Sequence, residues 1–203
     1  MKNIKIIFLL LFITVFSTVQ AQRGETKLGI SYNVAVPMND FKNIVSATSY
    51  RGFNASILHG VSDKVSIGLA TGFQDFYQKT PRQVYHFSDG TDISAVVTNS
   101  IQTIPVLFDV KYNFSPAATV QPYAAIGVGG NLVAYDQLLG EFGNQQTKIK
   151  FAARPEAGIY IPFGKKPSGF NIGALYNIMP FKEGEFKNLN SLGIYAGVTI
   201  PLR

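Results

Sequence analysis

Hydrophobic residues recur at every second position of this chain over eight separate stretches. In residues 28–36 the even positions are large and apolar or aromatic, and the odd positions are small or polar. The same alternation recurs over residues 52–61, 65–74, 103–114, 123–135, 148–163, 170–178 and 191–202. Because successive side chains of a β-strand point to opposite faces, each stretch predicts a strand with one apolar face and one small or polar face.

The charged positions indicate which face points inward. Arg or Lys at the middle of a bilayer costs roughly 2–4 kcal/mol, so the charged faces of stretches 103–114 and 148–163 cannot face lipid. We therefore expect the apolar residues to point outward and the charged residues to point into a lumen. The expected structural charge cluster of the lumen consists of Asp109, Lys111, Lys150, Arg154 and Glu156. Confined carboxylates repel one another unless bases intervene, so we expect at least one direct contact between a carboxylate and a base.

The connections between the stretches alternate in length. Residues 61–64, 115–119 and 164–168 are short connections, whereas residues 38–49, 78–97, 136–146 and 179–190 are long. Short periplasmic turns and longer outer loops are typical of outer-membrane barrels, whose tilted strands need roughly 9–11 residues to cross the bilayer. The sequence thus predicts an all-β protein, an eight-stranded antiparallel up-and-down transmembrane β-barrel. Residues 78–97, the longest connection, are expected to be the most mobile.

Closure is required because an unpaired sheet edge is costly in hydrocarbon. Pro105 and Pro155 fall inside predicted strands. Proline lacks a backbone N–H donor, and a closed barrel has no edge strand to accommodate it. We therefore expect β-bulges at both positions.

The N-terminus has the features of an export signal. Lys2 and Lys5 precede an apolar run over residues 6–19, and Val19-Gln20-Ala21 is a small-x-small cleavage pattern. The alternative is an uncleaved anchor, but the run is short for a membrane-spanning helix. We expect a signal peptide over residues 1–21, a barrel domain over residues 22–203, and localisation to the outer membrane of a Gram-negative envelope.

Composition narrows the possible functions. The sequence contains no cysteine, which excludes disulfides, thiolate metal sites and a catalytic thiol. The full chain has 18 basic and 12 acidic residues; without Lys2 and Lys5 the balance is 16 to 12, or +4. These charges are dispersed and form no basic stripe, so nucleic acid is not an expected partner.

Few residues are candidates for chemistry. His59 lies at the foot of the second predicted strand, where a polar aromatic residue at the membrane interface is the ordinary interpretation. His86 lies close in sequence to Ser88 and Asp89, but neighbours along a loop do not establish a catalytic triad. The segment 89–92 lacks the ligand spacing of an EF-hand, and the glycines of 127–130 lack the context of a dinucleotide site. We expect no catalytic, cofactor-binding or metal-binding residues.

Aromatic residues fall into two groups by height along the predicted strands. Carbohydrate or ligand stacking is one interpretation, and two interfacial girdles is the interpretation we favour. The group near the short turns is Tyr112, Phe114, Phe163 and Phe170, and the group towards the long connections is Tyr32, Phe73, Phe151 and Tyr176.

The strand patterns of residues 103–114 (TIPVLFDVKYNF) and 121–130 (QPYAAIGVGG) resemble those of the outer membrane protein β-barrel domain family, often labelled PorT-like or porin family. The resemblance covers essentially the whole chain after residue 21. It implies a small barrel of OmpA- or OmpX-type architecture, mostly without an assigned activity.

Three functional classes follow for such a chain. The first is a non-enzymatic membrane protein with a side-chain-filled lumen, which has a structural role or presents its loops to an envelope or extracellular partner. The second is a pore or transporter for small solutes. The third is a soluble ligand-binding barrel, whose apolar residues would face inward. Outer-membrane lipid is the expected surrounding, and no cofactor is expected.

Overall fold

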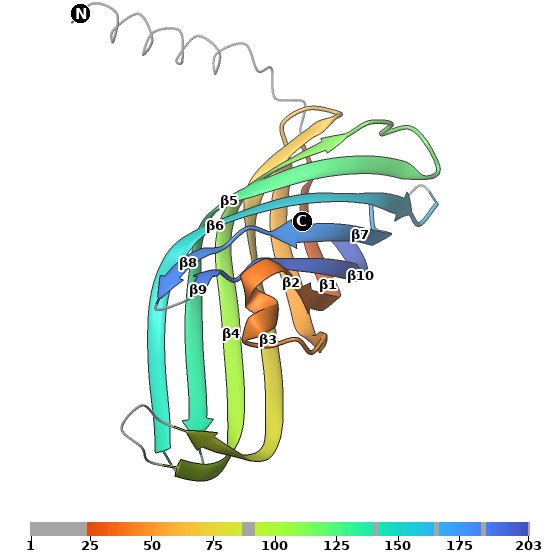
Figure 1. Ribbon diagram of the computed structural model, residues 1–203. Coiled ribbons are helices and arrows are strands. Elements are labelled where there is room, and N and C mark those ends of the chain that lie inside the picture. Colours follow the sequence, from red (N-terminus) through yellow and green to blue (C-terminus); the bar gives the residue numbers. More distant parts are fainter. Residues whose placement is uncertain (1–23, 87–91, 140–141, 165–166, 184–185, 203) are drawn as a thin grey trace, which may run out of the picture.

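The computed structural model describes residues 24–86, 92–139, 142–164, 167–183 and 186–202. Eight antiparallel strands close into a ring in the order β1-β10-β7-β6-β5-β4-β3-β2 (Figure 1). Their bounds are β1 Thr26–Pro37, β2 Ser49–Gly60, β3 Val65–His86, β4 Asp92–Asn113, β5 Gln121–Leu139, β6 Phe142–Pro162, β7 Gly169–Asn177 and β10 Ser191–Leu202. The predicted eight-stranded up-and-down barrel is confirmed.

The two faces of the strands are as the alternation predicted. On β1, Ile30 and Tyr32 are half exposed on the outer surface, whereas Ser31 and Asn33 are buried in the lumen. On β4, Val106 and Phe108 are exposed and Leu107 and Asp109 are buried. The outer surface is therefore an apolar band, and the smaller and more polar side chains point into the interior.

Four of the strands are much longer than the other four. β3 to β6 have 19 to 22 residues each, whereas β1, β2 and β10 have 12 and β7 has 9. The pairing of β2 with β3 ends at Gly52 and Gln74, after which β3 continues to His86. Residues 75–86, 92–102, 134–139 and 142–147 thus leave the ring as a four-stranded sheet, which we call the extension (Figure 1). At about 3.3 Å per residue, residues 75–86 span roughly 40 Å.

The extension corrects the predicted loops 78–97 and 136–146. All the described residues of these two ranges are in strands, and residues 87–91 and 140–141 are outside the described residues. The prediction was wrong because apolar alternation marks only those strand segments that have one apolar face. Both faces of the outer part of the extension carry many polar residues, yet its backbone hydrogen bonding continues.

The predicted bulges at Pro105 and Pro155 are also absent. Pro105 pairs with Asn131 and Pro155 with Ile126 with no shift of register. A proline removes one donor but adds no residue to its strand, so the register can be kept. The register shifts lie elsewhere, between Asn33 and Ala35 and between Thr80 and Gln83, where Pro81 and Arg82 stand opposite the single residue Val96.

The remaining elements belong to the connections at the end of the barrel from which the extension rises, which we call the loop end. They are the 3-10 helix η1 (Asn39–Asn43) and a small hairpin of β8 (Pro180–Glu183) and β9 (Phe186–Asn188). We call the opposite end the turn end, because it holds the short connections 61–64, 114–120 and 163–168. No helix among the described residues is long and apolar enough to cross a membrane.

Segments at the loop end fill that end of the lumen. Phe41 from η1 contacts Phe76 of β3 edge to face, with ring centroids 4.7 Å apart. We call residues 38–45 and 179–190 the plug. Its buried apolar residues are Phe41, Ile44, Val45, Met179, Phe181 and Leu189, and they pack on Ala35, Phe76, Ile101, Leu107, Val133 and Ala152 of the barrel strands. The alternation pattern did not predict the plug, because its residues lie in segments that lack strand alternation.

Candidate functional site in the lumen

The charged residues of the lumen meet across strand β5. Asp109 of β4 and Arg154 of β6 both pair with Gly127 of β5, so the three residues form one row across the sheet. A Cβ atom at Gly127 would lie 2.2 Å from Asp109 Oδ1. Glycine at this position therefore leaves space for the two charged side chains to approach each other over β5.

Arg154 is the centre of the expected charge cluster. Its Nη2 lies 3.7 Å from Asp109 Oδ2, and its Nε lies 3.8 Å from Glu156 Oε2. Its Nη1 donates a hydrogen bond to Asn54 Oδ1 at 3.4 Å. The side chains of Arg154 and Asp109 are 4% and 5% exposed, so this pair is largely removed from water. The expected carboxylate–base contact is present.

Two tyrosines support the second carboxylate. Tyr195 of β10 donates its hydroxyl to Glu156 Oε1 at 3.3 Å, and the hydroxyls of Tyr195 and Tyr123 lie 2.5 Å apart. Both tyrosine side chains are buried. A chain of hydrogen bonds thus connects β5, β10 and β6 across the lumen.

The two lysines of the expected cluster are placed differently. Lys111 lies in the row of Glu156, and its Nζ sits over the ring of Tyr123, 3.5 Å from the centroid. Lys150 does not join the cluster, because it is four residues above Arg154, roughly 13 Å along the strand. Its Nζ lies 5.4 Å from the ring centroid of Phe181, in the plug.

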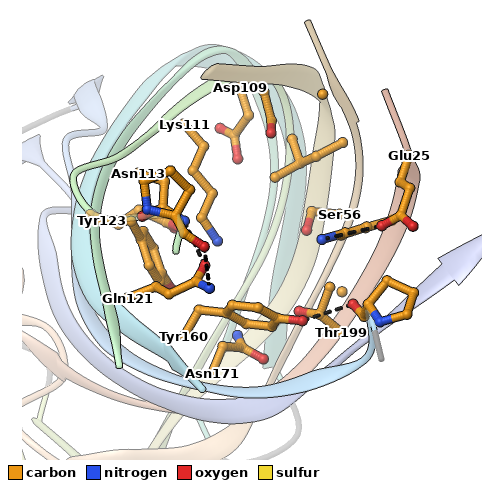
Figure 2. Close-up of a pocket in the computed structure, with 18 of the residues that line it drawn as sticks. Glu25, Ser56, Asp109, Lys111, Asn113, Gln121, Tyr123, Tyr160, Asn171 and Thr199 are labelled. Carbon is orange, nitrogen blue, oxygen red and sulfur yellow. Dashed lines mark hydrogen bonds and ion pairs between the residues drawn. The ribbon is translucent and has the colours of Figure 1, made fainter. Parts of the chain in front are cut away.

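Below the cluster is a cavity of about 440 Å³ at the turn end (Figure 2), so the lumen is only partly filled by side chains, in contrast to the expected filled lumen. Asp109 and Arg154 line its deep end, and Glu25, Asp63 and Lys64 line the mouth, where they are exposed to solvent. Figure 2 shows Lys111 and Tyr160 pointing into this space. The cavity has a volume typical of small-molecule pockets, which range over about 300–1,000 Å³.

A buried polar layer separates the cavity from the plug. Asn33 Nδ2 donates to Gln74 Oε1 at 2.7 Å, and Gln74 Nε2 donates to Ser49 Oγ at 2.6 Å. Asn131 is fully buried, and its Nδ2 lies 2.7 Å from Met179 Sδ. Together with Leu107, which is 1% exposed, this layer closes the deep end of the cavity.

His59 is outside the lumen site, and the side chain of His86 is not among those that the structure describes. His59 is exposed on the outer surface near the turn end, where its Nδ1 lies 3.0 Å from Thr26 Oγ1. His86 ends β3, paired through its backbone with Asp92, and Ser88 and Asp89 lie outside the described residues. Among the described residues there is no group of three or more acidic or histidine side chains that could hold a metal ion.

The two groups of aromatic residues lie on the outer surface at the predicted heights. Tyr112 and Phe114 contact each other edge to face at the turn end, with centroids 5.1 Å apart. Phe53 and Phe73 stack at 6.1 Å on the loop-end side, beside Tyr32. Their outward positions at the two ends of the apolar band favour the girdle interpretation.

Comparison with known proteins decides the family. The profile of the outer membrane protein beta-barrel domain matches residues 8–200. The chain belongs to this family. The family places the chain in the outer membrane, where the apolar band of the barrel faces lipid. A comparison with curated proteins gives no match.

Solved structures share the architecture at low sequence identity. Neisserial surface protein A is 14% identical and superposes with a TM-score of 0.53, over 88% of this chain and 97% of that one. The attachment invasion locus protein Ail of Yersinia pestis, solved with the heparin analogue sucrose octasulfate, is 14% identical, with a TM-score of 0.48 over 87% and 99%. Outer membrane protein W of E. coli is 11% identical, with a TM-score of 0.47 over 88% and 98%. The first of these likenesses supports the fold alone.

Proposed function

We propose that this protein is a non-enzymatic outer-membrane barrel with a closed lumen, which acts by presenting its extension to a partner outside the cell. The proposal rests on the arrangement at the loop end, where the barrel is closed and the extension begins. The plug fills the barrel there, and four strands continue past it as a sheet. A barrel that served only as a membrane anchor would not need strands of 19 to 22 residues, about twice the roughly 9–11 that cross the bilayer.

The orientation follows from the connections. Short turns lie on the periplasmic side and longer segments outside in barrels of this kind. Both chain ends of the barrel, Thr26 and Leu202, pair with each other at the turn end, as expected for an even number of crossings. We therefore place the extension in the extracellular space, and we propose that residues 1–21 are removed as a signal peptide, so that the mature chain begins at Gln22.

The alternative function is a pore for small solutes, and the plug disfavours it. An eight-stranded barrel is only just wide enough for its own side chains. In the plug, Phe41, Phe181 and Leu189 are each no more than 6% exposed to solvent. A soluble ligand-binding barrel is disfavoured by the apolar outer band, which such a protein would turn inward.

Cysteine labelling tests the proposed presentation directly, because the chain has no native cysteine. Lys79→Cys places a thiol on an exposed position of the extension, and Asp63→Cys places one in a short turn. A membrane-impermeant maleimide added to whole cells should label the first variant and spare the second until the outer membrane is permeabilised. The opposite pattern would show that the orientation is reversed and that the extension cannot meet an extracellular partner.

A further inference from the structure

The cavity at the turn end has features of a binding site that the closed barrel itself does not require. Many charged and polar residues line it, its deep end is closed, and its mouth is at the short turns. Small barrels of this width can fill their interior with side chains. This chain instead keeps about 440 Å³ empty on one side of the charge cluster.

The negative charges at the deep end already have partners. Asp109 and Glu156 both contact Arg154, and Glu156 also accepts a hydrogen bond from Tyr195. These carboxylates are therefore not available for an incoming cation. Any ligand must be recognised by the groups that line the cavity between the cluster and the mouth.

Lys111 is the group in this region that lacks an acceptor. Among the described residues its ammonium makes no hydrogen bond or ion pair, and its contacts are with the rings of Tyr123 and Tyr160, at 3.5 and 5.9 Å from the centroids. A ring face attracts a cation but does not replace the three acceptors that an ammonium group can take. The ammonium is thus held in place with its donors unused.

Lys27 approaches the same tyrosine from another strand. Its Nζ lies 5.6 Å from the centroid of Tyr160 and 3.6 Å from Glu25 Oε2 at the mouth. The tyrosine is fixed, because its hydroxyl donates to Pro167 O at 2.8 Å and its ring packs so closely on Gly169 that a Cβ there would lie 2.5 Å away. Two ammonium groups, from β1 and β4, therefore lie 5.6 and 5.9 Å from the centroid of one fixed ring.

We propose that Lys27 and Lys111, which both approach Tyr160, form a seat for a small oxyanion, a carboxylate or a phosphate group, which enters from the turn end. Two ammonium groups near one ring repel each other. Glu25 partly offsets the charge of Lys27, and Glu156 and Asp109, which already contact Arg154, partly offset that of Lys111. A bound oxyanion supplies the missing acceptors and charge. The flexible lysine stems allow both ammonium groups to turn towards it. This site is independent of any partner of the extension.

Titration of the folded protein in detergent micelles tests the seat. Sodium phosphate and sodium acetate are added in separate experiments at constant ionic strength, and the NMR shifts of the Lys111 and Tyr160 amides are followed. At least one of the two probes should give saturable shifts, and the comparison of the two identifies the preferred oxyanion. Sodium chloride at the same ionic strength should give no saturable shift.

Four variants locate the binding. Lys27→Met and Lys111→Met should each weaken binding at least tenfold, whereas Lys111→Arg, which keeps the charge, should retain most of it. Lys79→Met, on the extension, should bind as the original protein does. Folding of each variant is checked by its heat-dependent electrophoretic shift. If Lys111→Met does not fold, the binding affinity of Lys27→Met alone decides the test. Shifts that stay linear with both probes, or equal affinity of Lys27→Met and the original protein, would overturn the proposal.

Discussion

Arg154 and Asp109 face each other across strand β5, with 3.7 Å between Nη2 and Oδ2 and less than a tenth of either side chain exposed. Removing one partner of a buried ion pair costs about 3–5 kcal/mol, because the remaining charge is left without compensation. Here Arg154 also faces Glu156, so its loss leaves two carboxylates close together.

We therefore predict that Arg154→Ala lowers the unfolding temperature far more than Lys187→Ala, whose side chain is exposed on β9. Thermal unfolding followed by circular dichroism, or by loss of the heat-dependent electrophoretic shift, measures the difference. Equal unfolding temperatures for the two variants would mean that the cluster does not stabilise the barrel.

Gly127 lies between Asp109 and Arg154, and we expect that it cannot be replaced by a larger residue without loss of stability. Gly127→Ala places a Cβ 2.2 Å from Asp109 Oδ1, whereas the nearest atom to a Cβ at Gly130, three positions along the same strand, is 3.7 Å away. Overpacking of this kind costs about 1–3 kcal/mol. We predict that Gly127→Ala destabilises the barrel and that Gly130→Ala is close to neutral. If the two alanine variants unfold at the same temperature, the ion pair does not depend on the space above Gly127.

The sequence predicted those features that depend on alternation. Strand β10 was predicted with its observed bounds, and the inward position of Asp109, Arg154 and Glu156 followed from the cost of a charge in lipid. The strand pattern could not reveal that Gly127 lies between Asp109 and Arg154, because that relation depends on the register of three strands.

The plug was missed for a different reason. Phe41, Ile44 and Val45 are spaced as on one side of a helical turn, and Phe181 and Leu189 stand in a polar connection. Apolar residues in a segment assigned to solvent are a signal that the segment packs on something. Which surface they pack on is a matter of tertiary structure and cannot be derived from the alternation of the strands.

Loosening the plug should leave the barrel intact. Phe41 is fully buried against Phe76, whereas its neighbour Lys42 is exposed. Truncating a buried phenylalanine to alanine costs about 3–5 kcal/mol, but here the loss falls on a segment whose backbone is outside the barrel's hydrogen bonds. We predict that Phe41→Ala speeds amide hydrogen exchange over residues 39–45 and leaves exchange in β10 unchanged, and that Lys42→Ala changes neither.

Uniform acceleration of exchange in the Phe41→Ala variant, including β10, would show that the plug and the barrel unfold as one unit. Unchanged exchange over residues 39–45 would show that Phe41 does not hold η1 in place.

The outer part of the β3–β4 hairpin, residues 79–98, should be dispensable for folding. Gln78 and Asn99 are paired across β3 and β4, so residues 79–98 can be replaced by a two-residue Asn-Gly turn, which favours a hairpin. We predict that this variant inserts and shows the same heat-dependent electrophoretic shift as the full chain, because the ring and the plug are unaltered. Failure to fold would mean that the outer part of the extension contributes to barrel assembly.

Conductance across a planar lipid bilayer tests the central claim, that the lumen is closed, most directly. The protein is reconstituted in its folded form, as shown by its heat-dependent electrophoretic shift, and a voltage is applied in symmetrical salt. The buried layer of Asn131 and Leu107 and the apolar plug above it predict no stable conductance steps. Reproducible, ion-selective steps from the folded protein would contradict the account and would favour a pore for small solutes.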